Sequence, residues 1–293
     1  MTSAIDAIGA TRNLPYCSTP RLSSVGKGGR ILTAVSADGV RIVYLRLGQG
    51  RPLVIVGGAL YDHRRWLKVA HLLSGRLTVC VMDRRGRGGS GDANDYMPER
   101  EIDDIAAVIA ATGGFADLLG HSSGALLSLQ AALTGLPIRR LVLYEPPYFP
   151  GGKEPRAADL PDRLFELIRA GELDDAVATF LLEGPRLPPA AVEARRGTPM
   201  WQEALQCARS LPYDSIIQLS FKLDPARLAR VQIPTLLLLG GASSPAMRAG
   251  TETIARALPN SQIVVMPKQE HVAMVSAPDL LADAVKPFLA VDQ

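Results

Sequence analysis

One serine of this chain, Ser122, lies in a sequence pattern that is typical of a catalytic nucleophile. Gly120-His121-Ser122-Ser123-Gly124 fits the pattern G-x-S-x-G, which places a serine on a sharp turn between a strand and a helix. Only small neighbours fit that turn. A serine hydroxyl is a weak nucleophile at neutral pH, so it needs a base, and the base needs a group to orient it. The alternative is a glycine-flanked turn with an incidental serine.

The base should be a histidine, because the imidazole pKa lies near neutral pH. The chain has four. His63 and His71 lie in or near an expected helix, where surface or packing roles suffice, and His121 should point away from the serine. His271, in "PKQEHVAMV", follows the last expected strand and falls at the same sheet edge as Ser122. A solvated loop histidine is the alternative interpretation.

Alternating strands and helices must position these residues. Asp38-Gly39 joins strand-like runs at 31–37 and 41–48 as a hairpin. Apolar strands are expected at 52–58, 77–83, 115–120, 140–145, 234–241 and 262–267, and helices at 64–74, 98–113, 123–134, 246–257 and 278–290. Such alternation predicts an α/β fold with a mostly parallel sheet covered on both faces.

The alternation stops between residues 147 and 227, where amphipathic helical stretches are punctuated by proline. We therefore expect a helical cap at 147–227 inserted into a core formed by residues 30–146 and 228–293. Residues 1–29 are rich in Ser, Thr and Gly, and we expect an extension that is loosely ordered or lies on the surface. There are no internal repeats.

Composition restricts the class of protein. The 293 residues are 47% hydrophobic and 21% charged, with a net charge of +3, which is ordinary for a globular domain. The dense basic run is limited to 83–88, so we expect neither nucleic acid nor membrane as a partner. Cys17, Cys80 and Cys207 are far apart, which favours a reducing cytoplasm. No apolar run of ~18 residues or convincing signal peptide appears. The oligomeric state is not indicated.

Six motifs together resemble an α/β-hydrolase-fold protein with a cap, over about residues 35–290. They are "VGGAL" (56–60), "DRRGRGGSG" (83–91), "GHSSG" (120–124), "YEPP" (144–147), "PTLLLLGG" (234–241) and "QEHVAM" (269–274). The resemblance implies Ser122 as nucleophile and His271 as general base. It also implies that the backbone N–H groups of Ala59 and Ser123 form the oxyanion hole. The family often has His-Gly after the third strand, where this chain has Gly57-Gly58; backbone donors need no imidazole there.

The acid is where the chain departs further from the family. Many relatives carry Asp after the strand at 234–241, but this chain has Ala242. Some members, haloalkane dehalogenases among them, place the acid after the preceding core strand, and that position here is Glu145. We therefore predict Ser122, His271 and Glu145 as the catalytic set. Glu145 could instead only brace the entry to the insertion.

Other residues near the predicted site receive lesser roles. Ser243 or Ser244 could orient the imidazole weakly, without a charge. Glu270 adjoins the base, but its side chain should point away. Asp83 and the arginines at 84–87 are interpreted as structural, since no lysine and serine pair follows them as in a phosphate-binding loop.

Ser122 at the nucleophile position argues against epoxide hydrolases and haloalkane dehalogenases, which attack through a carboxylate. The first hypothesis is a serine hydrolase that cleaves an ester, lactone or thioester of a fairly apolar small molecule through an acyl-enzyme. We expect substrate contacts at Leu60, Tyr148, Met200 and Trp201, although such side chains could equally form the cap's own core. No metal or organic cofactor is expected.

Three alternatives share this scaffold. A biosynthetic acyltransferase or cyclase would resolve the acyl-enzyme with a hydroxyl or amine in place of water. A carbon–carbon bond hydrolase would use similar residues. A ligand-binding protein without turnover is the third, although the presence of both Ser122 and His271 argues against it.

Overall fold

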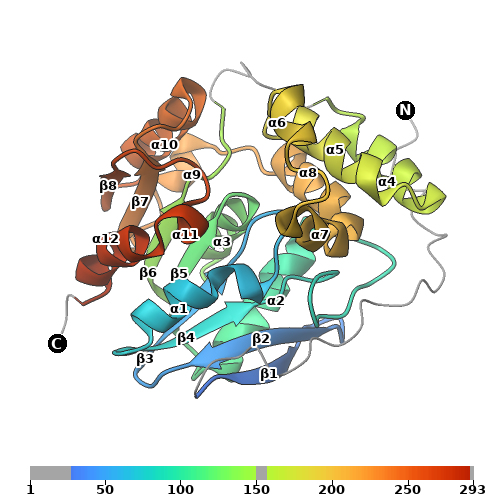
Figure 1. Cartoon of the computed structure of the whole chain (residues 1–293). Coiled ribbons are helices and arrows are strands. Elements are labelled where there is room, and N and C mark those ends of the chain that lie inside the picture. Colours follow the sequence, from blue (N-terminus) through green and yellow to red (C-terminus); the bar gives the residue numbers. More distant parts are fainter. Residues whose placement is uncertain (1–27, 150–156, 291–293) are drawn as a thin grey trace.

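One eight-stranded sheet forms the centre of the molecule (Figure 1). The computed structural model describes residues 28–149 and 157–290, so nearly all of the predicted extension at 1–29 lies outside the described residues. The strands are β1 (Arg30–Val35), β2 (Arg41–Leu47), β3 (Arg51–Val56), β4 (Leu77–Met82), β5 (Ala116–His121), β6 (Ile138–Tyr144), β7 (Thr235–Gly240) and β8 (Ser261–Met266). Each lies within a residue or two of a stretch predicted from the sequence.

The strand order is β1-β2-β4-β3-β5-β6-β7-β8. β1 and β2 form the predicted antiparallel hairpin, β2 pairs antiparallel with β4, and all later pairs are parallel. The register pairs His121 with Tyr144 and Gly240 with Met266. The carboxyl ends of β5 to β8 therefore meet at one edge, which confirms the predicted mostly parallel sheet and brings the loops after them together.

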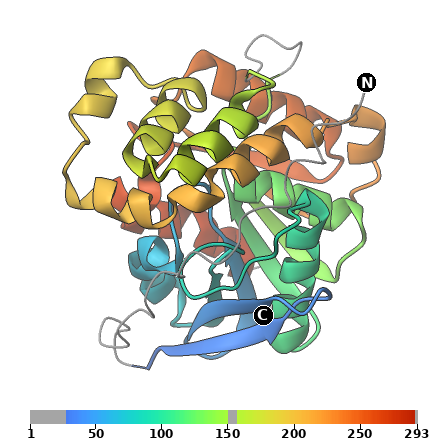
Figure 2. The same ribbon diagram turned by 90° about the vertical axis from the view of Figure 1, so that its right-hand side faces the viewer.

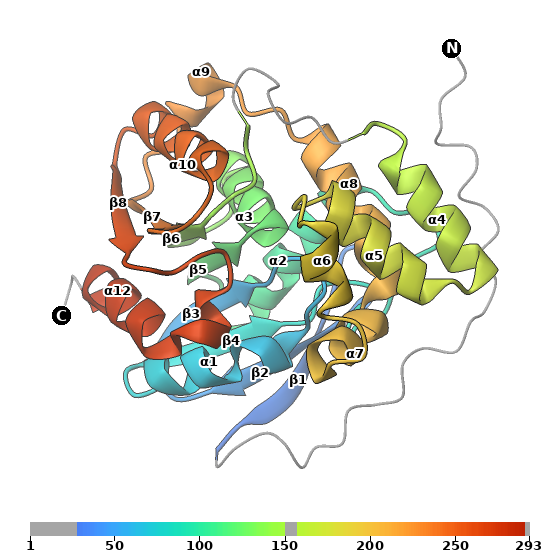
Figure 3. The same ribbon diagram turned by 45° about the horizontal axis from the view of Figure 1, so that its top comes forward.

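Helices cover both faces of the sheet because side chains alternate along each strand. Val54 and Val56 of β3 pack on one side with α2 (Pro98–Ala111), α3 (Ser123–Leu133) and α10 (Pro245–Ala257). Leu53 and Ile55 pack on the other side with α1 (Leu67–Leu73) and α12 (Pro278–Ala290). Figure 3 shows α1 and α12 side by side, away from α2 and α3. Two short helices, η3 (His63–Trp66) and α11 (Ala273–Ser276), directly precede α1 and α12 in the sequence and contact each other.

A group of helices lies between β6 and β7 in the sequence. It comprises α4 (Leu160–Ala170), α5 (Leu173–Glu183), α6 (Pro189–Glu193), α7 (Pro199–Gln206), η5 (Ala208–Ser210), α8 (Leu211–Ser220) and α9 (Pro225–Leu228). We call α4 to α8 the inserted helices. They share a core that includes Leu164, Phe180 and Trp201, and Figure 2 shows them gathered above the sheet. Their status as a separate cap with bounds 147–227 stays a prediction.

Within residues 28–149 and 157–290, no helix combines the length and apolar character needed to cross a membrane. The cytoplasmic location stays a prediction from the cysteines.

Candidate active site

Ser122 occupies the turn between β5 and α3, as its flanking glycines predict. Its backbone has φ 55° and ψ −127°, a conformation that costs a non-glycine residue free energy and persists only where the surroundings impose it. They do so here because the Ser122 N–H donates to the Tyr144 carbonyl at 3.0 Å and its own carbonyl accepts from the Ala125 N–H at 2.8 Å. The side chain therefore stands at the carboxyl edge of the sheet, at the start of α3.

Close backbone approaches explain two of the glycines around this turn. A Cβ on Gly124 would lie 2.3 Å from the Val56 carbonyl oxygen, so α3 can begin against β3 only with glycine there. A Cβ on Gly58 would lie 2.8 Å from the Ser122 Cβ. The loop after β3 thus packs directly against Ser122, where the predicted oxyanion donor Ala59 requires it.

His271 and Glu145 lie within hydrogen-bond distance of each other. His271 Nδ1 is 2.7 Å from Glu145 Oε2, and the glutamate side chain is fully buried. Because a carboxylate only accepts, Nδ1 carries the proton and Nε2 of the neutral ring is free to accept one. No direct hydrogen bond joins Ser122 Oγ to the His271 ring within the described segments. Catalytic contacts of this kind commonly tighten only once substrate binds.

Three donors keep the Glu145 carboxylate ionised. Burial alone would raise the pKa of Glu145, but the hydrogen bonds from His271, Ser243 and Gly240, together with the positive charge that His271 carries when it is protonated, hold it below its usual value. Ser243 Oγ donates to Glu145 Oε1 at 2.5 Å and the Gly240 N–H donates to the same oxygen at 2.7 Å. The loop after β7 has Ala242 at the position where the resemblance implied an acid, yet the end of β7 and this loop supply the two groups that hold the carboxylate of Glu145, which follows β6.

We expect Ser243→Ala to lower the free energy of unfolding by about 1.5 kcal/mol, because it removes one hydrogen bond to a buried charged group. Urea denaturation of the purified variant measures this. Ser276→Ala is the control: its serine is exposed and donates to Gln269, and we expect a change below about 0.5 kcal/mol. Equal effects of the two substitutions would contradict a specific role for Ser243.

Tyr144 anchors the loop that carries His271. Its hydroxyl donates to the Glu270 carbonyl and accepts from the Ala273 N–H at 3.0 Å, so it holds the chain on both sides of the histidine. The Ala242 N–H adds a bond to the Gln269 carbonyl at 2.9 Å. Glu270 itself is exposed, in keeping with the expectation that it does not orient the base.

His121 lies closer to the base than the sequence suggested. That His121 points away from Ser122 stays a prediction; its ring centroid is 4.6 Å from that of His271, and its Nε2 is 2.8 Å from the His271 carbonyl oxygen. Burial, assisted by the neighbouring His271, lowers the pKa of His121 well below its usual value. His121 is therefore a neutral ring that packs against the base without adding charge.

A buried ion-pair cluster beside the turn was not anticipated. Arg84 and Arg87 follow β4, Glu101 belongs to α2, and Asp214 belongs to α8; all four are at most 2% exposed. Arg84 pairs with Glu101 and Asp214, and Arg87 pairs with Asp214. The sequence indicated that the arginines are structural, but no pattern could reveal a partner more than a hundred residues away.

The four predicted substrate contacts lie in different settings. Leu60 and Trp201 are buried in the core of the inserted helices, where Trp201 Nε1 donates to Asp174 at 2.7 Å. Tyr148 packs partly buried beside α10, and Met200 is 37% exposed. Leu60 follows the predicted donor Ala59 directly. Their contact with substrate stays a prediction.

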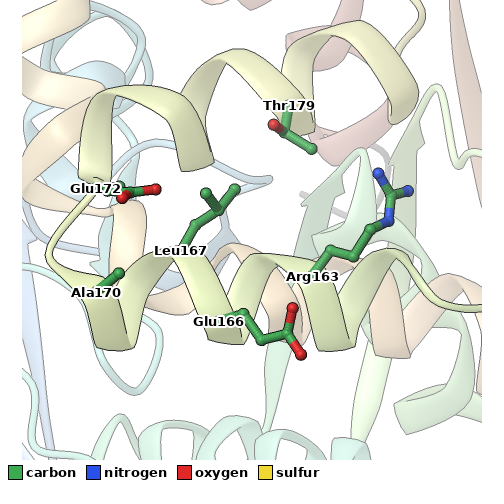
Figure 4. Close-up of a pocket in the computed structure, with 6 residues that line it drawn as sticks. All are labelled: Arg163, Glu166, Leu167, Ala170, Glu172 and Thr179. Atoms are coloured by element: carbon green, nitrogen blue, oxygen red, sulfur yellow. The ribbon is translucent and has the colours of Figure 1, made fainter.

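A cavity of about 390 Å³ lies between α4 and α5 (Figure 4). It is lined by Arg163, Glu166, Leu167, Ala170, Glu172 and Thr179. None of these belongs to the predicted catalytic set, and Arg163 is already paired with Glu183. We assign no function to this cavity.

Asp62, His63 and Asp83 form a buried group whose ligand-type atoms lie within 4.8 Å of one another. Their atoms already have protein partners: Asp62 pairs with Arg64, and Asp83 accepts from the His63 ring and the Gly89 N–H. The group is therefore explained as a structural hydrogen-bond cluster that holds the loop after β3 against the loop after β4.

The sequence and the structure of this chain are both similar to those of known proteins. The sequence model of the alpha/beta hydrolase family matches residues 53–284. The chain belongs to the alpha/beta hydrolase family. A crystal structure of an alpha/beta hydrolase from Sphaerobacter thermophilus superimposes with a TM-score of 0.83, at 41% identity, covering 88% of this chain and all of that one. This alpha/beta hydrolase thus has the fold and family that its motifs predicted.

Two characterised relatives are hydrolases. N-formylmaleamate deformylase from Pseudomonas putida is 40% identical over 132 residues, which span 43% of this chain and 49%, about half, of the deformylase. 2-(Acetamidomethylene)succinate hydrolase from Mesorhizobium japonicum is 29% identical over 245 residues, covering 74% of this chain and 80% of that enzyme. The protein is an alpha/beta-fold hydrolase.

Proposed function

We propose that this alpha/beta hydrolase cleaves a carboxylic acid derivative through an acyl-enzyme on Ser122. The observation that carries the proposal is the 2.7 Å contact between His271 Nδ1 and the buried Glu145 carboxylate. That contact fixes the tautomer in which Nε2 can take a proton. A histidine held in this way, at the same sheet edge as a strained serine, is the arrangement that activates a serine nucleophile.

The reaction follows from these roles. His271 Nε2 takes the Ser122 proton while Oγ attacks the substrate carbonyl carbon, and Glu145 stabilises the resulting imidazolium. The Ala59 and Ser123 N–H groups bind the oxyanion, a type of contact whose loss costs about 10²–10³ in kcat. His271 then gives the proton to the leaving group as its bond to the acyl carbon breaks. Water, activated by the same histidine, hydrolyses the acyl-enzyme and frees Ser122.

We propose that the inserted helices act as the cap over Ser122 and supply the substrate pocket. Leu60 and Tyr148, together with Met200 and Trp201 of α7, would then contact the acyl or alkyl portion. An ester, lactone or thioester of a fairly apolar small molecule is the first substrate class, because such leaving groups need least assistance.

Hydrolysis of an N-acyl group is the second candidate, and the relatives favour it. The names of the two characterised relatives specify an N-formyl and an acetamido compound. The same residues would act, with His271 protonating a departing nitrogen. Comparison of p-nitrophenyl acetate with p-nitroacetanilide would rank the two classes, since both substrates carry the same acetyl group.

We expect a fluorophosphonate probe to label the folded protein at Ser122 alone, because only an activated serine attacks phosphorus readily. Tryptic mass spectrometry of the labelled protein identifies the site. Ser128→Ala should still be labelled, whereas Ser122→Ala and heat-denatured wild type should not. An unlabelled Ser122 in the folded wild type would refute the nucleophile assignment.

A further inference from the structure

The buried cluster of Arg84, Arg87, Glu101 and Asp214 joins the inserted helices to the core. Arg84 Nε lies 2.6 Å from Glu101 Oε2 and Arg84 Nη1 lies 2.9 Å from Asp214 Oδ1, while Arg87 Nη2 lies 2.6 Å from Asp214 Oδ2. Two guanidinium groups balance two carboxylates, so the cluster has no surplus charge with which to bind an anionic substrate. Its remaining hydrogen bonds indicate a different role.

Both arginines also donate to the loop after β3. Arg87 Nη1 donates to the Gly58 carbonyl at 2.5 Å, and Arg84 Nη1 approaches the Gly57 carbonyl at 3.4 Å. No peptide bond within the described residues is cis, and in a trans peptide the C=O and N–H point in opposite directions. Because the Gly58 carbonyl and the Ala59 N–H share one peptide unit, Arg87 fixes the direction of that N–H.

The other oxyanion donor is linked to the same carboxylate. Ser123 Oγ donates to Asp214 Oδ1 at 2.6 Å and accepts from Arg84 Nη1 at 3.0 Å. Ser123 is the first residue of α3, and the first N–H groups of a helix have no acceptor within it. Holding the Ser123 side chain therefore steadies the residue whose N–H is the predicted second oxyanion donor.

We propose that Asp214 is a positioning residue for the oxyanion hole, acting on Ala59 through Arg87 and on Ser123 directly. The inference rests on the proposed function, since it assumes that these two N–H groups bind the oxyanion. Asp214 touches no reacting atom. Because it belongs to α8, the inserted helices must be seated on the core before both donors are aligned, which couples the placement of the cap to the rate of the chemical step.

The neighbouring pair Arg85–Asp104 provides a matched control. It is equally buried, with Arg85 Nε 2.7 Å from Asp104 Oδ2 and Arg85 Nη2 2.7 Å from Asp104 Oδ1. Arg85 otherwise donates to Asp38 and to the Arg100 carbonyl, and no bond links this pair to residues 57–59 or 123 in the described structure. Breaking the Arg85–Asp104 pair or the pairs of Asp214 removes a buried ion pair from the same loop after β4. Only the loss of Asp214 should disturb the two oxyanion donors.

The test compares Asp214→Asn with Asp104→Asn, using p-nitrophenyl acetate and separate values of kcat and KM. We expect Asp214→Asn to lower kcat by about 10- to 100-fold and to change KM less than threefold. The loss of kcat should be smaller than that caused by removing an oxyanion donor, because the donors are misaligned and not removed. Asp104→Asn should lower thermal stability but leave kcat within about threefold. Equal losses of kcat in the two variants, or a change confined to KM, would overturn the proposal.

A second pair of variants keeps the charges and protects the test against misfolding. The ammonium group in Arg87→Lys can pair with Asp214 but cannot at the same time reproduce the second guanidinium hydrogen bond to the Gly58 carbonyl. We therefore expect Arg87→Lys to lower kcat about tenfold and Arg85→Lys to leave it unchanged. Ser122→Ala separates this inference from the proposed function. If Ser122→Ala retains activity, the proposed function fails; if it abolishes activity and both kcat comparisons show no difference, only the role of Asp214 fails.

Discussion

Glu145→Gln is expected to lower kcat for p-nitrophenyl acetate by about 10³–10⁴-fold, the scale found when the acid of a catalytic triad is replaced by its amide. The Gly240 N–H and the Ser243 hydroxyl both donate to Glu145 Oε1, so the glutamine oxygen will occupy that position. Its NH₂ then faces His271 Nδ1, which must accept. The proton moves to Nε2, and the ring can no longer take the proton of Ser122.

Glu270→Gln is the control for this substitution. It removes a carboxylate directly beside His271 in the chain, but one that is exposed, so kcat should stay within about twofold. Steady-state kinetics across pH 6 to 9 would measure both variants. A loss below about threefold in Glu145→Gln would contradict its role as the acid, because a residue that sets the tautomer must cost far more.

Ser122→Ala is expected to lower kcat by about 10⁶-fold, since removing the nucleophile of such a set costs about as much as removing the whole set. KM for the residual turnover would show whether the substrate pocket of the variant remains intact. His271→Ala in the same background should cause little further loss. A double variant much slower than Ser122→Ala alone would mean that His271 acts independently of the serine.

The strained backbone of Ser122 should also make the stability of the protein depend on which residue replaces the serine. At φ 55°, glycine avoids the steric cost that alanine retains. The free energy of unfolding of Ser122→Gly should therefore be about 1 kcal/mol higher than that of Ser122→Ala, although both variants are inactive. Urea denaturation of the two variants measures the difference. If alanine proves the more stable, the turn is not held under strain.

The fold was predictable because its signals are local. Apolar runs such as 52–58 and 234–241 correspond to β3 and β7, and Asp38-Gly39 forms the expected hairpin. Ser122 also follows from short-range chemistry, since two flanking glycines and a strand-to-helix change lie within a dozen residues. The prediction of Glu145 required the resemblance to family members that place the acid after the preceding core strand, together with the expectation that the carboxyl ends of these strands meet.

What sequence reasoning missed depends on contacts between distant segments. Asp214 has no special context in "LPYDS", and its significance appears only when α8 lies against Arg84 and Arg87. The packing of His121 against His271 was likewise not anticipated, because the contact joins the end of β5 to a loop 150 residues further along the chain. Neither contact has a signature in the spacing of residues.

The ion pairs at Asp214 also limit how this protein can change in evolution. If the inserted helices supply the substrate pocket as proposed, exchanging them for those of a relative is an obvious route to a new substrate, since the pocket would change while the sheet remained. Here such an exchange would remove Asp214 and leave Arg84 and Arg87 buried with a single carboxylate, and breaking a buried pair costs about 3–5 kcal/mol. New specificity should therefore arise by point substitution within α4 to α7, with α8 inherited together with the core.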